Sequence, residues 1–395
     1  MNKNRYQTMI KVSDILAGGL EKYLRSHKLS FKQRKVLSKV INCFSEKMPK
    51  LVFECTNKDC DYTEHKKQPC RDRHCNRCNN NKKMKWVVKL VKQFPPLPYY
   101  HIVFTLPHEL NNLLICNQKL LYDMFFKSSF YVLNTFGADK KHFGGKIGYL
   151  GLLHTWGQKL NYHVHIHFMV LAGGIKEGQY KQLPYYKDFI FPVEAMSKVM
   201  MGKFIEMLKA NYEKGKLRFP GKLEAISSEQ KFNNFLYKLS KKEWVIYSKK
   251  PFPKSDKVLE YISRYAYKVA ISNNRIKSYA NGEVIFEYRD YYDKDKNDFP
   301  KKKTAKLSDI EFIRRYMLHI LPNRFRKIRY GGIFSSNQKS ESLKIIKEYF
   351  ETVRRKLKES TKEWIEQIEK QINYLCPYCM GKLLPKKIIS LSGYV

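Results

Sequence analysis

Three histidines alternate with apolar residues in the segment NYHVHIHFMVL at 161–171. In a strand, successive side chains point to opposite faces, so His163, His165 and His167 lie on one face and the apolar side chains on the other. Three adjacent imidazoles would repel one another if protonated, and a shared metal ion is the simplest stabilising partner. The segment predicts a strand that binds a divalent metal; the alternative is a row of hydrogen-bonded surface histidines.

Two tyrosines in the segment YISRYAYK at 261–268 stand four residues apart. This spacing places Tyr261 and Tyr265 on one face of a predicted helix, with Lys268 on the same face and Arg264 nearby. A phenol has a pKa near ~10 and is a poor nucleophile at neutral pH, so a neighbouring cation that favours the phenolate suits a nucleophilic role. Because the chain has 28 tyrosines, such a pair is common by chance, and a helical tyrosine stripe taken alone more often belongs to a core.

Seven of the nine cysteines fall in two clusters, at 55–78 and 376–379. In a reducing compartment such clusters indicate metal binding rather than disulfides. A knuckle of the form Cys-x2-Cys can wrap a tetrahedral zinc ion, and one occurs at 75–78. The predicted zinc ligands are Cys55, Cys60, Cys75 and Cys78, with Cys70, His65 and His74 as substitutes.

The other cysteines are interpreted differently. Cys43 and Cys116 look like ordinary buried thiols. Cys376 and Cys379 form a second knuckle, which supplies two ligands. A second zinc site there needs residues from elsewhere in the chain, or from the partner in a homodimer.

The charge balance points to a polyanionic partner. Among 395 residues, 76 Lys and Arg face 36 Asp and Glu, for a net charge of +40. This excess exceeds what solubility needs and favours a nucleic acid, although a lysine-rich coding bias is the simpler alternative. The residues predicted to contact DNA are Arg71, Arg73, Arg77, Lys82, Lys83 and Arg264.

The elements that must position these residues read as α+β. Helical periodicity covers 10–45, 82–94 and 118–136, and strands are predicted at 101–106, 163–171, 244–247 and 284–288. A helix is expected over about 257–269. The pattern Ser308-x-x-Glu311 predicts a helix start, and 341–373 is a charged helical stretch. No apolar stretch is long enough to cross a membrane, so we expect a cytoplasmic protein.

Prolines at 95, 96 and 98 suggest a first boundary near residue 95. The predicted domains are 1–94, helical and zinc-binding; 95–295, an antiparallel sheet flanked by helices; and 296–395, a helical region ending in the second knuckle.

Together, the histidine and tyrosine segments resemble the HUH endonucleases, named for a His-hydrophobic-His motif, here His165-Ile166-His167. The sequence is similar to the insertion-sequence 91 family of transposases over about 50–335 and at the terminal Cys-Pro-x-Cys. The similar segments are VFTLPHEL at 103–110, TWGQKLNYH at 155–163, YISRY at 261–265, AISN at 270–273 and EFIRR at 311–315, with His319 and Leu321-Pro322.

The resemblance implies that His165 and His167, with His163 as the chosen third ligand and Gln158 or His154 behind it, hold Mg or Mn. Tyr265, Tyr261 or both would attack a phosphate of single-stranded DNA at transposon ends, leaving a 5′-phosphotyrosine, without ATP. The family also carries an N-terminal zinc-binding domain, whose first cysteine pair is usually spaced by two residues, whereas four separate Cys55 from Cys60. The implied setting is the nucleoid of a bacterium or an archaeon.

Three other functions compete with this interpretation. A rolling-circle replication initiator or a relaxase would use the same chemistry, although the sequence has no Gly-x4-Gly-Lys-Ser/Thr helicase loop. A non-catalytic zinc regulator of nucleic acid explains the charge and the cysteines but not the histidine row. A hydrolase that activates water would release ends with no protein attached.

Overall fold

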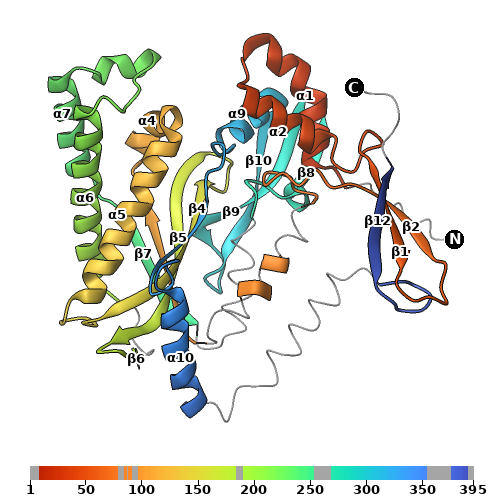
Figure 1. Cartoon of the computed structure of the whole chain (residues 1–395). Coiled ribbons are helices and arrows are strands. Elements are labelled where there is room, and N and C mark those ends of the chain that lie inside the picture. The colour runs from red at the N-terminus through yellow and green to blue at the C-terminus, as the bar shows by residue number, and fades with distance from the viewer. Residues whose placement is uncertain are drawn as a thin grey trace.

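A computed structural model describes the chain over residues 9–78, 84–86, 88–90, 97–183, 190–252, 268–353 and 375–389. Within these ranges, antiparallel sheets flanked by helices confirm the predicted α+β fold. Figure 1 shows a long central sheet with a stack of helices on one side and two small sheets on the other. No helix in the described ranges has both the length and the apolar character needed to span a membrane.

The central sheet has the strand order β11-β4-β5-β3-β7, and β6 pairs with the end of β5. Its strands are β3 (Tyr99–Thr105), β4 (Lys146–Trp156), β5 (Tyr162–Lys176), β6 (Gln179–Gln182), β7 (Ile246–Phe252) and β11 (Ile328–Gly332). The strands predicted at 101–106 and 163–171 are confirmed, and the one predicted at 244–247 overlaps the start of β7, which runs from Ile246 to Phe252. Strand β4 was not predicted, because it is buried on both faces and lacks the alternation that identifies a half-exposed strand.

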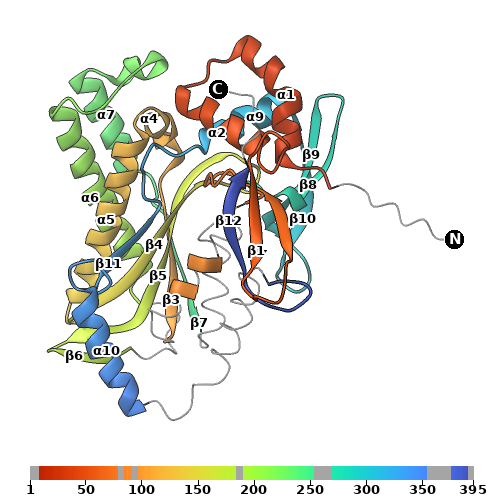
Figure 2. The same cartoon turned by 45° about the vertical axis from the view of Figure 1, so that its right-hand side comes forward.

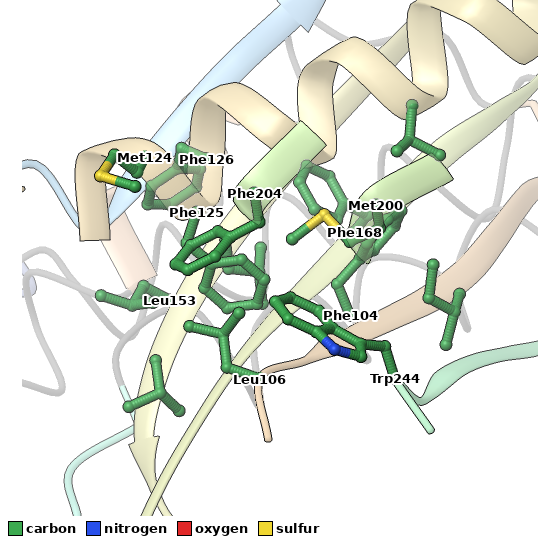
Figure 3. Close-up of a cluster of buried hydrophobic side chains, with 14 of the residues drawn as sticks. Phe104, Leu106, Met124, Phe125, Phe126, Leu153, Phe168, Met200, Phe204 and Trp244 are labelled. Atoms are coloured by element: carbon green, nitrogen blue, oxygen red, sulfur yellow. The ribbon is translucent and has the colours of Figure 1, made fainter. Parts of the chain in front are cut away.

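Helices cover one face of this sheet. They are α4 (Asn111–Cys116), α5 (Gln118–Ala138), α6 (Val193–Glu213) and α7 (Glu229–Ser240), with short 3-10 turns at His108–Leu110 and Gly221–Ile226. Figure 3 shows Phe104 and Phe168 of the sheet packed among side chains of α5 and α6, with Trp244 closing the cluster. The apolar face of β5 is therefore fixed against helices, and its histidine face must point the other way.

A second core joins segments that are far apart in the sequence. It packs α1 (Val12–Ser26) and α2 (Phe31–Ile41) against the sheet β10-β9-β8 and α9 (Asp309–Leu318). The strands are β8 (Ile276–Ala280), β9 (Glu283–Lys294) and β10 (Pro300–Ser308), after a 3-10 turn at Asn273–Arg275. Residues of all three predicted domains contribute to this core. The boundaries of these domains stay predictions.

The third sheet has the order β12-β1-β2 and lies apart from the helix stack, at the right of Figure 1. It contains β1 (Lys50–Cys55), β2 (Thr63–Lys67) and β12 (Leu383–Ile389). Figure 2 shows the last strand of the chain lying beside one of the first. Helix α10 (Lys339–Val353) follows β11.

The C-terminal region adds strands β10, β11 and β12 to its predicted helices. The predicted helices at 10–45 and 118–136 and the strand at 284–288 are confirmed, and α9 begins directly after Ser308, whose hydroxyl accepts from the Glu311 N–H at 3.2 Å. The helix predicted at 257–269 lies almost wholly outside the described residues, as does most of the one at 82–94.

Candidate functional site: a histidine centre and two cysteine clusters

The hairpin formed by β4 and β5 brings three histidines together. His154 of β4 lies opposite His165 of β5, and Leu152 lies opposite His167, so all three imidazoles are on the face turned away from the helices. One ring nitrogen from each of His154, His165 and His167 lies within 4.8 Å of the others. We call these residues the histidine centre.

The predicted third ligand, His163, lies next to this centre and stays a prediction. His163 does share the strand face, and its ring centroid lies 5.0 Å from that of His165. However, the described residues whose ring nitrogens converge are His154, His165 and His167, because β4 pairs with β5 and places His154 opposite His165. Gln158, another alternative, bonds to the backbone N–H of Arg289 and to the Tyr291 hydroxyl instead.

Hydrogen bonds orient the two histidines that β5 contributes to the centre, His165 and His167. His165 Nδ1 lies 3.0 Å from the His163 carbonyl, so it must donate, which leaves Nε2 as an acceptor for a metal. His167 Nδ1 lies 2.9 Å from Nε2 of the buried His101 on β3. If His167 uses Nε2 as a ligand, its Nδ1–H donates to His101. Sequence reasoning missed His101, because only strand pairing places it beside His167.

Burial keeps the imidazoles of His165 and His167 neutral. It lowers the pKa of His165 to about 3, with His163 and Lys268 adding to the shift. Burial also lowers the pKa of His167 well below its usual value, helped by His154, His165 and His101. Neutral imidazole is the form that binds metal, so the donor set fits a divalent transition metal, with positions left open for substrate. His165 is partly exposed, so substrate can approach from its side.

The predicted nucleophiles Tyr261 and Tyr265, together with Arg264, lie outside the described residues. Lys268 is the first described residue after them. It lines a small pocket with Trp156, whose ring stacks on His154 at 4.6 Å between centroids. Desolvation, Arg275 and Arg289 lower the pKa of Lys268, and its charge in turn lowers the pKa of His165 and His167. The structure thus places Lys268 beside the histidine centre.

The cysteines form two clusters of four, and the four predicted zinc ligands divide between them. The inner cluster is Cys43, Cys70, Cys75 and Cys78, and the outer cluster is Cys55, Cys60, Cys376 and Cys379. Cys75 and Cys78 are thus together, but Cys55 and Cys60 belong to another site. Cys43, predicted to be an ordinary buried thiol, belongs to the inner cluster and lies two residues after the end of α2. Among the described cysteines, only Cys116 belongs to neither cluster.

The inner cluster fits a structural zinc ion. All four cysteines are buried, and Cys70 and Cys78 have Sγ atoms 3.5 Å apart. Zinc–sulfur bonds of about 2.3 Å in a tetrahedron place sulfurs roughly 3.8 Å apart, so a small adjustment would accommodate the ion. The backbone N–H of Arg77 points at Cys75 Sγ at 3.4 Å, which supports a thiolate. These cysteines lie within the second core, against α1, α2 and α9.

Residues around the inner cluster attach it to the rest of the chain. Arg73 donates to the Phe325 carbonyl at 2.6 Å, and Arg77 donates to the Cys43 carbonyl. His74 pairs with Asp72 at 2.7 Å and accepts from the Leu321 N–H at 3.1 Å. Arg73, Arg77 and His74 therefore have internal structural roles, whereas Arg71 is exposed. Lys82 and Lys83 lie outside the described residues, and DNA contact by any of the predicted basic residues stays a prediction.

The lysines at 301–306 also have internal partners. Lys301 and Lys303 contact Asp293 at 2.7 and 2.9 Å, and Lys306 contacts Glu283 at 2.6 Å. These ion pairs link β10 to β9 and offset part of the positive charge that the sequence places there. The β9–β10 hairpin therefore carries less unpaired positive charge than its lysines at 301–306 suggest.

Two models of known protein families match parts of the chain. Residues 148–342 match a family model described as a putative transposase, and residues 15–106 match one described as a transposase zinc-binding domain. The first match contains the histidine centre and the second contains the inner cluster. No solved structure matches the chain.

Two curated relatives are similar over most of their length. The chain is 34% identical over 334 residues to the putative transposase y4qJ of Sinorhizobium fredii, covering 84% of this chain and 82% of that protein. It is 29% identical over 302 residues to the transposase for insertion sequence element IS801 of Pseudomonas savastanoi pv. phaseolicola, covering 76% and 70%.

Proposed function

Because the chain belongs to the insertion-sequence 91 family of transposases, we propose that it nicks and rejoins single-stranded DNA at the ends of its element, through a tyrosine and a divalent metal. Family membership makes it a DNA-processing enzyme whose partner is DNA. The finer chemistry rests on one observation above the others, the convergence of His154, His165 and His167 on one point beside Lys268.

The histidine centre would hold Mg or Mn, and a metal there would polarise the scissile phosphate and neutralise charge that develops on it. The chain's own residues supply the rest of the site. His101 and the His163 carbonyl orient the ligands, and burial keeps them unprotonated. Since three imidazoles suit manganese better than magnesium, we expect higher activity in Mn than in Mg across a titration.

The nucleophile is the Oη atom of Tyr265, of Tyr261, or of both in turn. Oη loses its proton and forms a bond to phosphorus while the bond from phosphorus to the 3′-oxygen breaks. The leaving oxygen takes up one proton to become a 3′-hydroxyl, so the protons balance. A 3′-hydroxyl of the target can then attack the 5′-phosphotyrosine and restore the phenol, so the bond energy is kept without ATP. Tyr265 is favoured because it precedes Lys268 by three residues, which span at most about 11 Å.

The test uses end-labelled single-stranded DNA from the element's termini, with Mg or Mn, resolved on denaturing gels. Tyr261→Phe, Tyr265→Phe, the double variant and His165→Ala are compared with wild type. Tyr292→Phe and His108→Ala, at exposed positions, serve as matched controls. We expect a covalent adduct of label and protein that is lost in His165→Ala and in at least one tyrosine variant, and kept in both controls.

Other outcomes would replace the proposal. Cleavage that persists in the double tyrosine variant, without an adduct, would indicate activated water. Binding without cleavage or adduct on authentic ends would indicate a zinc-containing DNA-binding protein with no nuclease activity.

A further inference from the structure

We propose that the outer cysteine cluster binds a second zinc ion, which fastens the C-terminal strand of the chain to the N-terminal sheet. The two halves of this site are more than 300 residues apart in the sequence. Cys55 Sγ lies 3.3 Å from Cys379 Sγ across 324 residues, and Cys60 Sγ lies 3.7 Å from Cys376 Sγ across 316. The matched zinc-binding family model ends at residue 106, so it contains only one half.

The four sulfurs are arranged for a metal rather than for disulfides. A disulfide has a sulfur–sulfur bond of about 2.05 Å, whereas a zinc tetrahedron places its sulfurs roughly 3.8 Å apart. All four Sγ atoms lie within 4.8 Å of one another, and the cysteines are free thiols. Four thiolates without a metal would repel one another, so zinc supplies the missing counter-charge.

The backbone on each side of the cluster is shaped for this role. In the C-terminal knuckle, Cys376 N–H donates to the Gly381 carbonyl at 2.7 Å, and Met380 adopts a left-handed φ of 60°. A Cβ on Gly381 would lie 3.0 Å from Cys55 Sγ and 3.2 Å from Cys379 Sγ, so any larger residue would crowd these two sulfurs. On the N-terminal side, the Asn57 N–H points at Cys55 Sγ at 3.5 Å.

Apart from the outer cysteine cluster, few buried side chains stabilise the sheet β12-β1-β2. Strand β12 pairs with β1 from Cys55 opposite Leu383 to Lys50 opposite Ile389. Its apolar cluster among the described residues is small, with three buried members, Phe53, Cys376 and Leu383, and Val52 of β1 is buried outside this cluster. Units this small usually need a metal or disulfides to fold stably. The zinc ion would therefore hold β12 in place, independently of the inner cluster and of the histidine centre.

Zinc content of the full-length protein tests this proposal without reference to DNA cleavage. We expect two tightly bound zinc ions per chain by elemental mass spectrometry. Cys376→Ser with Cys379→Ser, and separately Cys55→Ser with Cys60→Ser, should each reduce this to one. Cys116→Ser is the matched control and should keep two. Each double variant should also expose the two remaining outer cysteines to alkylation, while the inner four stay protected, which shows that the rest of the protein is folded.

Gly381→Ala offers a milder variant. It keeps every ligand but crowds the sulfurs, so we expect faster loss of one zinc equivalent to a chelator and an unchanged second equivalent. If wild type holds a single zinc ion, or if either double variant still holds two, the proposal is wrong.

A mixing experiment distinguishes a site within one chain from one shared by two chains. The two double variants are unfolded, mixed, refolded with zinc and measured again. We expect one zinc ion per chain, as in each variant alone. A rise toward one and a half zinc ions per chain would mean that the C-terminal knuckle of one chain completes the outer site of another chain. That result would overturn the proposal of a zinc site within a single chain.

Discussion

His154 and His165 lie directly opposite each other on β4 and β5, and this pairing, rather than the spacing along one strand, completes the histidine centre. His167 joins from two residues further along β5. His163 contributes its backbone carbonyl to His165, an interaction that does not depend on its imidazole.

This division of roles predicts different effects for two histidine variants. His154→Ala should weaken Mn binding by more than roughly 100-fold, because a ligand is lost, whereas His163→Ala should weaken it by less than about 10-fold. Titration of Mn followed by electron paramagnetic resonance measures both affinities. The reverse order of effects would restore His163 as the third ligand.

His101 should act as a positioning residue for His167. His101→Phe removes the acceptor 2.9 Å from His167 Nδ1 and should weaken Mn binding by about 10–100-fold, while His101→Gln retains an acceptor and should recover part of it. The same titration applies, with thermal melting as a check on folding. Equal affinities in both variants and wild type would show that the contact does not orient the ligand.

The inner cysteine cluster should be required for stability, because it lies within the second core. Cys43→Ser should remove one zinc ion and destabilise the protein by more than about 4 kcal/mol, whereas Cys116→Ser should cost about 1 kcal/mol or less. Urea unfolding with parallel zinc measurement gives both numbers. A Cys43→Ser protein that keeps its zinc and its stability would remove Cys43 from the site.

Acid should destabilise the protein through His319. Burial lowers its pKa to about 4, and Nε2 donates to the Leu160 carbonyl at 3.1 Å. An unfolded histidine has a pKa near ~6.5, so between these values only the unfolded chain takes up the proton, and stability falls as the pH decreases. From pH 7 to pH 5 this group should contribute a loss of about 2 kcal/mol.

The measurement compares urea unfolding of wild type and His319→Gln at the two pH values, followed by fluorescence of the nearby Trp156. For each protein, the free energy of unfolding at pH 5 is subtracted from that at pH 7. The pH dependence of zinc binding is shared by both proteins, so it cancels when these two differences are compared. If the two proteins lose the same stability on acidification, His319 is not the group responsible.

The sequence by itself determined the elements whose signals are local. Strand β5 follows from the alternation of His163, His165 and His167 with apolar residues, since strand geometry alone sends them to one face. The start of α9 follows from Ser308, whose hydroxyl caps a helix through a contact three residues away. The cysteine knuckles were likewise readable, because each is a short loop that closes on itself.

Only the tertiary structure decided how these local units meet. Strand β4 is apolar along its length and gives no alternation, so neither its register nor the position of His154 was readable. Cys43 and Cys70 join Cys75 and Cys78, while Cys55 and Cys60 meet residues at the other end of the chain. The two Cys-x2-Cys knuckles offer the same ligands at the same spacing, so the spacing does not say which other cysteines share an ion with each. That choice is made by strand pairing and core packing across hundreds of residues, as in the ladder that brings β12 to β1.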